Sequence, residues 1–485
     1  MSQIVNMIFQ VLFSLVEALF TGISDLIVAA TPSKRNESFN ADFLPANKLL
    51  SKVEKGFCLT GDKNISVKAS FNNSIIFGNS GSGKSSRLLI PSILTMNTAS
   101  LVIHDPSREL FNITAKAKSD AGYSVKVIDY TNPEKSQKYN PLERVKTISD
   151  IKKIAKILIH TSLGGSGNKD VFWNISAENV LVIFIRYILF HAEKNYQNLY
   201  NVAILIDAFS GTPQKVDKLF VATKDDELLS MYKALVATDS KMLASIVSTA
   251  KASLLIFTDT EIAAVTSADT IDFESFRKQK TVLYINNNVS DSKYYSIISS
   301  LFFEQFFQSI LKTLPDQTDI PIFFLLDESS SLFLPIMGTA ISNCRKYNCG
   351  ICNVYQTQNQ LLDLYGVQQG RNILANSYSR VYFPGQQLEV CRELEALSGK
   401  FEFMDDQNIR RTKSLLTMDE IRTLKETLIL IGNYPIIKTK SMPYYEHPKL
   451  KQVVDLPVYE IEPQYSEEDL ATINLNGNEQ AKQEA

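Results

Sequence analysis

The chain has 485 residues, of which 45% are hydrophobic and 21% are charged, and its formal net charge is −2. These values are ordinary for a globular protein of two or three domains. They exclude bulk basicity as a basis for nucleic-acid binding, so a role of that kind would need a local basic surface. The count of five cysteines favours a reducing compartment over a disulfide scaffold.

The N-terminal residues 1–30 are mostly apolar, and their only charges are Glu17 and Asp25. On a helical wheel the polar residues of this segment share one face. The pattern fits three alternatives: a single membrane anchor in an oligomer, a helix lying in the membrane interface, or a helix that docks on another protein. Lys34 and Arg35 follow at once, and in the anchor alternative they would place the rest of the chain in the cytoplasm.

After a polar connector at 31–50, strands alternate with helices. Strands are expected at 74–77, 101–104, 124–129, 282–285, 322–326, 350–355, 380–383 and 427–431, and helices at 85–94, 109–120 and 294–312. This alternation predicts a mostly parallel sheet covered on both faces. Between 141 and 270 helical periodicity dominates, with helices expected at 151–160, 170–190, 215–219, 226–235 and 243–256. We therefore expect an α/β domain from 51–140 and 271–450, an all-α insertion at 141–270, and an acidic flexible tail at 451–485.

A glycine-rich loop follows the first predicted strand and opens a helix. It reads Gly78-Asn79-Ser80-Gly81-Ser82-Gly83-Lys84-Ser85, followed by Ser86. This matches the phosphate-binding P-loop pattern in its required context, so all nine residues are predicted to bind a nucleotide. The glycines let the backbone wrap around phosphates, Lys84 would reach the β- and γ-phosphates of ATP, and the Ser85 hydroxyl would hold Mg²⁺.

An acidic pair, Asp327-Glu328, follows the apolar strand 322–326. Asp327 is predicted to contact Mg²⁺ through water, and Glu328 to polarise the attacking water, which favours ATP hydrolysis over phosphate transfer to a substrate. Gln356 ends the next apolar strand, where side chains face the ligand crevice of a parallel sheet, and we expect it to sense the γ-phosphate or position water. Arg345 is either a plain solvated charge or an arginine finger that reaches a neighbouring subunit's nucleotide.

Cysteines spaced Cys344-x4-Cys349-x2-Cys352, with Cys391 downstream, resemble an iron–sulfur ligand pattern. Cys349 and Cys352 lie in or beside the apolar run at 350–355, which predicts a buried strand. We therefore interpret them as small hydrophobic side chains.

Several segments resemble the TraG/TraD-like type IV coupling proteins, which are hexameric ATPases of bacterial conjugation. These segments are the glycine loop with Pro91, residues 104–110, 170–178, Asp327-Glu328, residues 344–347, 356–360 and 364–366, and residues 414–420 with 430–436. In the 104–110 segment, Ser107-Arg108 stand where the family usually carries Lys-Gly.

The resemblance implies a RecA-like P-loop ATPase domain with an inserted all-α domain, assembled as a hexameric ring at the cytoplasmic face of the bacterial inner membrane. It implies that ATP and Mg²⁺ drive single-stranded DNA, with an attached relaxase, into a type IV secretion channel. The resemblance also implies the roles given above for Lys84, Ser85, Asp327, Glu328 and Gln356. By position, Arg345 matches the arginine finger of the family. Two alternatives remain: a secretion ATPase that recruits protein substrates only, and a docking platform that binds nucleotide with little hydrolysis.

Overall fold

The structure is a computed structural model that describes residues 39–162, 171–287, 289–463 and 470–475. The chain divides into two units, which are considered separately. One comprises Met1–Ala41 with Gly399–Leu415, and the other comprises Asp42–Ser398 with Leu416–Ala485. The apolar segment predicted as an N-terminal helix, residues 1–30, lies outside the described residues.

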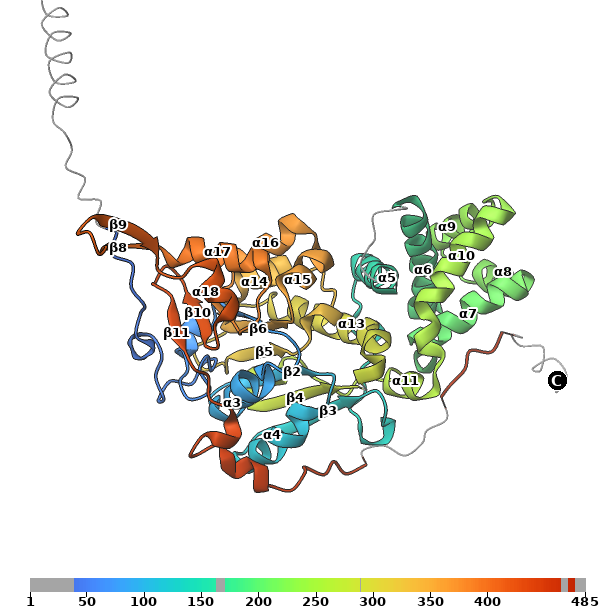
Figure 1. Cartoon of the computed structure of the whole chain (residues 1–485). Coiled ribbons are helices and arrows are strands. Elements are labelled where there is room, and N and C mark those ends of the chain that lie inside the picture. Colours follow the sequence, from blue (N-terminus) through green and yellow to red (C-terminus); the bar gives the residue numbers. More distant parts are fainter. Residues whose placement is uncertain (1–38, 163–170, 288, 464–469, 476–485) are drawn as a thin grey trace, which may run out of the picture. The chain divides into compact units, whose positions relative to one another are not determined.

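A mixed sheet forms the centre of the larger unit (Figure 1). Among the described residues it has nine strands in the order β11-β10-β7-β1-β6-β5-β2-β4-β3. The strands are β1 (Ser74–Phe77), β2 (Ser100–Asp105), β3 (Ser124–Asp129), β4 (Thr281–Asn286), β5 (Ile322–Leu326), β6 (Cys349–Tyr355), β7 (Ser379–Tyr382), β10 (Thr427–Ile431) and β11 (Ile437–Thr439). Pairing is parallel from β7 to β3, and β10 runs antiparallel to both β7 and β11. The predicted α/β class is confirmed.

Helices cover both faces of this sheet because its strands are apolar on both sides. In β5, Phe323 and Leu325 join one core with the helices α3 (Ile90–Thr95) and α4 (Glu109–Asp120). Ile322, Phe324 and Leu326 join the other core, where the Phe324 ring lies 4.3 Å from that of Phe307. The covering helices on this second side include α13 (Ser292–Ile310), α14 (Met337–Asn343), α15 (Gln358–Tyr365), α16 (Val367–Ala375), α17 (Leu388–Ser398) and α18 (Met418–Thr423).

Short elements complete the larger unit. They are α2 (Val67–Ser70), α12 (Ser275–Lys278), the π-helical turn η2 (Ser85–Leu89), and the 3₁₀ turns η1 (Ala46–Lys48), η3 (Pro133–Lys135), η4 (Pro141–Arg144), η5 (Lys194–Tyr196), η6 (Leu255–Thr258), η7 (Val289–Asp291), η8 (Ser329–Ser331), η9 (Cys344–Tyr347), η10 (Tyr444–Glu446) and η11 (Lys451–Asp455).

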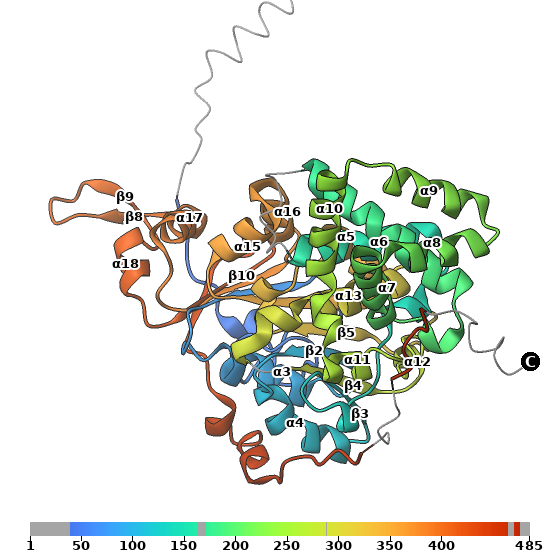
Figure 2. The same ribbon diagram turned by 90° about the vertical axis from the view of Figure 1, so that its right-hand side faces the viewer.

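Every described element between η4 and α12 is helical. The helices are α5 (Ile148–Ser162), α6 (Val171–His191), α7 (Leu199–Gly211), α8 (Pro213–Ala222), α9 (Asp226–Val236), α10 (Ser240–Leu254) and α11 (Thr260–Val265). Figure 2 shows them grouped beside the sheet. We call them the helical insertion. That this segment is a domain of its own, with the predicted bounds, stays a prediction.

Two described segments are long and apolar enough to cross a membrane by length and composition alone, namely Val171–His191 and Ser240–Thr258. Both belong to the helical insertion. Val180 to Ile185 of α6 are buried in its core, as in the central helix of a globular bundle.

The smaller unit contains a hairpin of β8 (Lys400–Met404) and β9 (Arg410–Ser414), which pair antiparallel. Asn40 forms a β-bridge to Phe401, so the described residues 39–41 extend this ribbon. The tight reversal between the strands includes Asn408 in the left-handed conformation, with φ of 59°.

The cysteines whose spacing resembles an iron–sulfur ligand pattern lie in the apolar cores, as their interpretation as small hydrophobic side chains predicts. Cys344, Cys349, Cys352 and Cys391 are buried free thiols, and Cys349 and Cys352 both lie in β6. In the described part of the chain, no group of three or more His, Cys, Asp or Glu side chains is placed to hold a metal ion. Burial raises the pKa of the Cys352 thiol, which keeps it in the neutral form of a small hydrophobic side chain.

The acidic tail predicted to be flexible is partly packed. The Tyr459 ring lies 6.3 Å from that of Phe111 on α4, edge to face. Residues 470–475 lie against α7, where Ile473 is buried. The difference arises because single apolar residues within an acidic segment find apolar surface on the folded unit.

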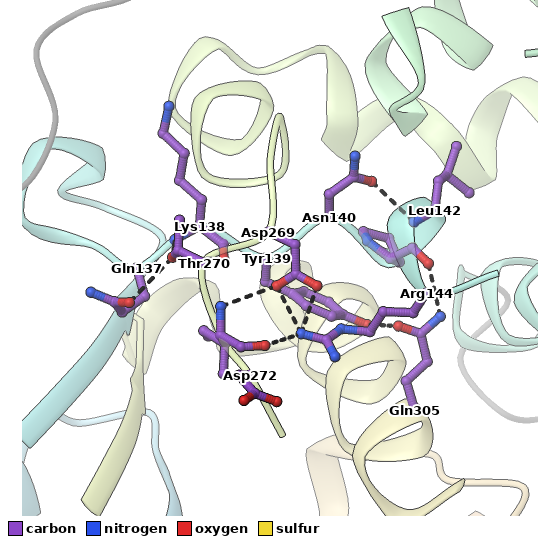
Figure 3. Close-up of polar contacts among 12 residues, drawn as sticks. Gln137, Lys138, Tyr139, Asn140, Leu142, Arg144, Asp269, Thr270, Asp272 and Gln305 are labelled. Atoms are coloured by element: carbon purple, nitrogen blue, oxygen red, sulfur yellow. Dashed lines mark hydrogen bonds and ion pairs between the residues drawn. The ribbon is translucent and has the colours of Figure 1, made fainter. Parts of the chain in front are cut away.

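The chain enters and leaves the helical insertion through two adjacent segments (Figure 3). Lys138 and Thr270 exchange hydrogen bonds, with the Thr270 amide donating to the Lys138 carbonyl at 3.0 Å. Arg144 forms an ion pair with Asp269 at 2.6 Å, donates to the Ile271 carbonyl, and stacks 3.5 Å above the Phe273 ring centre. Burial raises the pKa of the Asp269 carboxyl, and the Arg144 charge opposes that rise.

Arg144→Ala should lower the stability of the chain by about 2 to 4 kcal/mol, because it leaves the Asp269 carboxylate largely buried without its counter-ion. Urea denaturation monitored by circular dichroism measures this change. The matched control is Arg422→Ala, which removes an exposed pair with Asp419 at 4.0 Å and should cost less than about 1 kcal/mol. Equal effects of the two substitutions would contradict a special role for this junction.

Candidate functional site

The glycine loop lies between β1 and the helix that begins with η2. Gly81 and Gly83 have φ of +75° and +83°, a backbone conformation that other residues rarely adopt. A Cβ on Gly78 would lie 2.7 Å from the Ser82 hydroxyl and 2.9 Å from Cβ of Phe383. The loop therefore requires glycine at these positions, for φ at two of them and for space at the third.

The helix after the loop starts with a wide turn. The amide of Ile90 donates to the carbonyl of Ser85, which is the five-residue spacing of a π-helix. Pro91 lacks an amide hydrogen, so it cannot supply the normal bond to Arg87. Proline is a common cause of such irregularity in a helix, and the amino end of this helix follows the loop directly.

Two side chains of the loop, those of Lys84 and Ser82, are placed to bind an anion. Lys84 Nζ donates to the carbonyls of Gly78 at 2.6 Å and Asn79 at 3.1 Å. Burial lowers the pKa of Lys84, and the charges of Asp327 and Glu328 oppose that shift. The Ser82 hydroxyl is buried without a hydrogen-bond partner, which is rare for a buried polar atom. An anion in the loop would satisfy both groups.

The acidic pair lies opposite the loop. The Ser85 hydroxyl donates to Asp327 Oδ2 at 3.3 Å, and burial together with Glu328 raises the Asp327 pKa to about 6 against the effects of Lys84 and Ser85. Glu328 has φ of 59°, a strained conformation of the kind that clusters at functional sites. Gln356 Nε2 donates to Glu328 Oε1 at 3.3 Å, so the amide orients the carboxylate.

These residues meet because of the strand register. Phe77 of β1 pairs with Tyr355 of β6, and β6, β5 and β2 follow as parallel neighbours. The residues after each strand therefore emerge at the same edge of the sheet. Of the predicted site residues, the structure brings together the glycine loop, Asp327, Glu328 and Gln356.

Arg345 is not part of this group. It is exposed on η9, before the amino end of β6, whereas Gln356 follows the carboxyl end of the same strand. The seven residues of β6 separate the two by roughly 20 Å, at about 3.3 Å per residue. Within one chain Arg345 does not reach the acidic pair, so its predicted role would require a neighbouring subunit.

Two buried residues at the end of β2 extend the site. His104 donates from Nδ1 to the Asp327 carbonyl at 2.7 Å, and burial lowers the His104 pKa to about 4, so the ring is neutral at physiological pH. Asp105 accepts the Phe111 amide at 2.8 Å, and burial, with a contribution from Asp327, raises its pKa to about 7. Neither residue is among the predicted site residues, although both end a strand beside β5.

Arg108 stands where the family usually carries the glycine of Lys-Gly, and its contacts show how the chain accommodates an arginine there. It precedes α4 as its N-cap residue and is in the left-handed conformation, with φ of 58°, which costs little for glycine and more for arginine. Its guanidinium pairs with the buried Asp129 at 2.7 Å and lies 5.4 Å from the Phe111 ring centre. These contacts offset the backbone cost and connect β3 to the end of β2.

A cavity of about 620 Å³ opens beside the glycine loop. It is lined by residues of the loop and of the segments around β7 and β10, among them Asn79, Arg87, Phe383, Lys425 and Lys440. Arg87 donates to the Ser441 carbonyl at 2.5 Å, which fixes one wall. The cavity combines an aromatic ring with cationic side chains, a lining that suits a nucleoside next to bound phosphates.

The chain matches known proteins over most of its length. Residues 34–467 match the family model described as type IV secretory system conjugative DNA transfer. The protein VirD4 of Rhizobium radiobacter is 23% identical over 413 residues, which cover 79% of this chain and 58% of VirD4.

Solved structures show the same fold. The plasmid coupling protein TrwB in complex with the GTP analogue GDPNP has a TM-score of 0.64 at 18% identity, over 85% of this chain and 99% of that one. TrwB in complex with ADP and Mg²⁺ has a TM-score of 0.59 at 18% identity, over 88% of this chain and 97% of that one. The predicted RecA-like arrangement is therefore confirmed at the level of the fold.

The fold and the loop define a P-loop protein with a helical insertion. The chain belongs to the family of type IV secretory system conjugative DNA-transfer proteins. It spans about three-fifths of the length of the curated relatives it matches.

Asp105→Asn should stabilise the chain at pH 8 and have little effect near pH 4. The Asp105 pKa is raised from 3.8 to about 7. Between these two pH values the folded state binds more protons than the unfolded state, so the chain loses stability as pH rises, and the loss is complete above about pH 7. Asparagine keeps an acceptor for the Phe111 amide and has no charge to bury. The gain at pH 8 should be up to about 4 kcal/mol by denaturant titration, at about 1.4 kcal/mol per pKa unit. A gain independent of pH would contradict this explanation.

Proposed function

We propose that the chain is an ATP-hydrolysing coupling protein that drives single-stranded DNA, with its relaxase, into a type IV secretion channel. The observation that carries the ATPase part is the convergence of Lys84, Ser85, Asp327, Glu328 and Gln356 at one edge of the sheet. Family membership and the likeness to coupling proteins support the transport part.

The loop would bind the triphosphate of ATP through its backbone amides. Lys84 would exchange its contacts with the carbonyls of Gly78 and Asn79 for the β- and γ-phosphate oxygens. Ser85 and Asp327, already within hydrogen-bond distance, offer the two oxygens that would hold Mg²⁺. When bound, Mg²⁺ neutralises charge on the phosphate oxygens.

Glu328 would act on the attacking water. Its carboxylate, oriented by Gln356, would accept a proton as the water oxygen bonds to the γ-phosphorus. The bond from that phosphorus to the bridging oxygen breaks, and the products are ADP and inorganic phosphate. The neutral His104 holds the Asp327 carbonyl, so it fixes the backbone from which both acids project.

Lys84→Ala should abolish nucleotide binding, whereas Glu328→Gln should retain binding and lower turnover by about 100-fold or more. The first removes the phosphate cation, and the second keeps the shape of the carboxylate without its basicity. Fluorescent nucleotide binding and phosphate release separate the two effects. Turnover of Glu328→Gln at the rate of the unmodified chain would instead support a docking platform with little hydrolysis.

We further propose that the chain forms a homo-oligomer, expected to be a hexamer, at the cytoplasmic face of the bacterial inner membrane. Arg345 is exposed and distant from its own acidic pair, so we propose that it completes the site of a neighbouring subunit. A secretion ATPase that recruits protein substrates only is the second candidate, favoured by the net charge of −2 and the acidic C-terminal segment.

Single-stranded DNA should stimulate ATP turnover, and Arg345→Ala should lower turnover at least tenfold with nucleotide binding intact. The matched control is Lys346→Ala, which removes a neighbouring exposed charge on η9 and should change turnover little. Electron microscopy with ATP and DNA should show six-fold rings. If DNA does not change ATP turnover and the chain still captures a relaxase, the secretion ATPase that recruits protein substrates only would be favoured.

A further inference from the structure

Residues 470–475, with the sequence Leu-Ala-Thr-Ile-Asn-Leu, lie against α7 of the helical insertion (Figure 1). Burial along this segment alternates. Ile473 is 9% exposed, Thr472 and Asn474 are exposed, and Leu475 packs partly buried against the core. A period of two is the pattern of an extended peptide that presents one side to a surface.

One buried amide side chain forms hydrogen bonds with the backbone of this segment. Asn201 of α7 is fully buried, its Nδ2 donates to the Ala471 carbonyl at 2.9 Å, and its Oδ1 accepts the Ile473 amide at 2.7 Å. The carbonyl and the amide that flank a residue point to the same side of an extended chain. A single asparagine thus pairs with the peptide as a neighbouring strand would.

The position of Asn201 is fixed independently of the segment it binds. Asn198 caps α7 and accepts both the amide and the side-chain Nδ2 of Asn201, each at 3.0 Å. Residues 470–475 supply both of the backbone partners of the Asn201 side chain, which Asn198 holds in place whether or not the segment is bound. The surface is therefore built to receive a peptide backbone.

We propose that α7 carries a peptide-recognition site centred on Asn201, and that the chain's own residues 470–475 occupy it as a releasable strap. The class of ligand is an extended peptide with large apolar side chains two residues apart, as Ile473 and Leu475 are. The strap links the helical insertion to the sheet, since Tyr459 of the preceding segment packs on Phe111 of α4. Covalent attachment raises the local concentration of the segment, so a free peptide competes with it only at high concentration.

Hydrogen exchange of the full chain tests occupancy. Ile473→Asp places a charge in an apolar site and should raise the exchange rate of the residue 473 amide at least tenfold. Thr472→Ala removes only an exposed, long contact with the Tyr200 hydroxyl at 3.4 Å, and should change that rate far less than Ile473→Asp does. Equal protection in Ile473→Asp and the unmodified chain would overturn the proposal.

A fluorescent peptide of sequence Leu-Ala-Thr-Ile-Asn-Leu tests recognition by anisotropy. It should bind the Ile473→Asp chain at least tenfold more tightly than either the unmodified chain or the Ile473→Asp, Asn201→Ala double variant. Circular dichroism of the double variant shows whether the helices remain folded, and Asn198 still caps α7 in it. Binding to none of the three chains, or to all three equally, would overturn the proposal. Neither measurement depends on ATP turnover, so the outcome is separate from that of the proposed function.

Discussion

Parallel pairing of β1, β6, β5 and β2 is the constraint on which the rest of the site depends. It places the glycine loop, Gln356, the acidic pair and Asp105 at the same edge of one sheet, although these residues are far apart in the chain. A slip of one residue in β5 would exchange its two faces, moving Phe324 from one core to the other. The two apolar cores therefore fix the register, and the register positions the polar groups.

The sequence predicts the sheet well because its strands are short apolar runs bounded by polar or glycine residues, as at 322–326. The glycine loop and Asp327-Glu328 are recognisable from local patterns, and the structure places them together. Helix α7 escaped prediction because Val202, Leu205, Ile206 and Phe209 bury most of its surface, so it lacks a polar face with helical period. The roles of His104 and Asp105 depend on burial and on a neighbour more than 200 residues away, which local patterns do not encode.

The acidic C-terminal segment illustrates a different limit. Its average composition predicts disorder, yet Tyr459 and Ile473 each find a specific surface. Single anchors contribute little to a composition average and much to binding when the receiving site is preformed. Arg108, between β2 and α4, is a similar case, because its strained backbone is tolerated where Asp129 and Phe111 contact the side chain.

The strand order also has a consequence for how the chain folds as it is synthesised. None of β1, β2 and β3 pairs with another of these three: β1 lies between β6 and β7, β2 between β4 and β5, and β3 beside β4. All of their partners leave the ribosome after the helical insertion. These three strands therefore stay unpaired, with their apolar faces exposed, until the helical insertion and the later strands have been synthesised. Exposed unpaired strands are prone to aggregation. Helices of the insertion depend mainly on local contacts, so they can form during this interval.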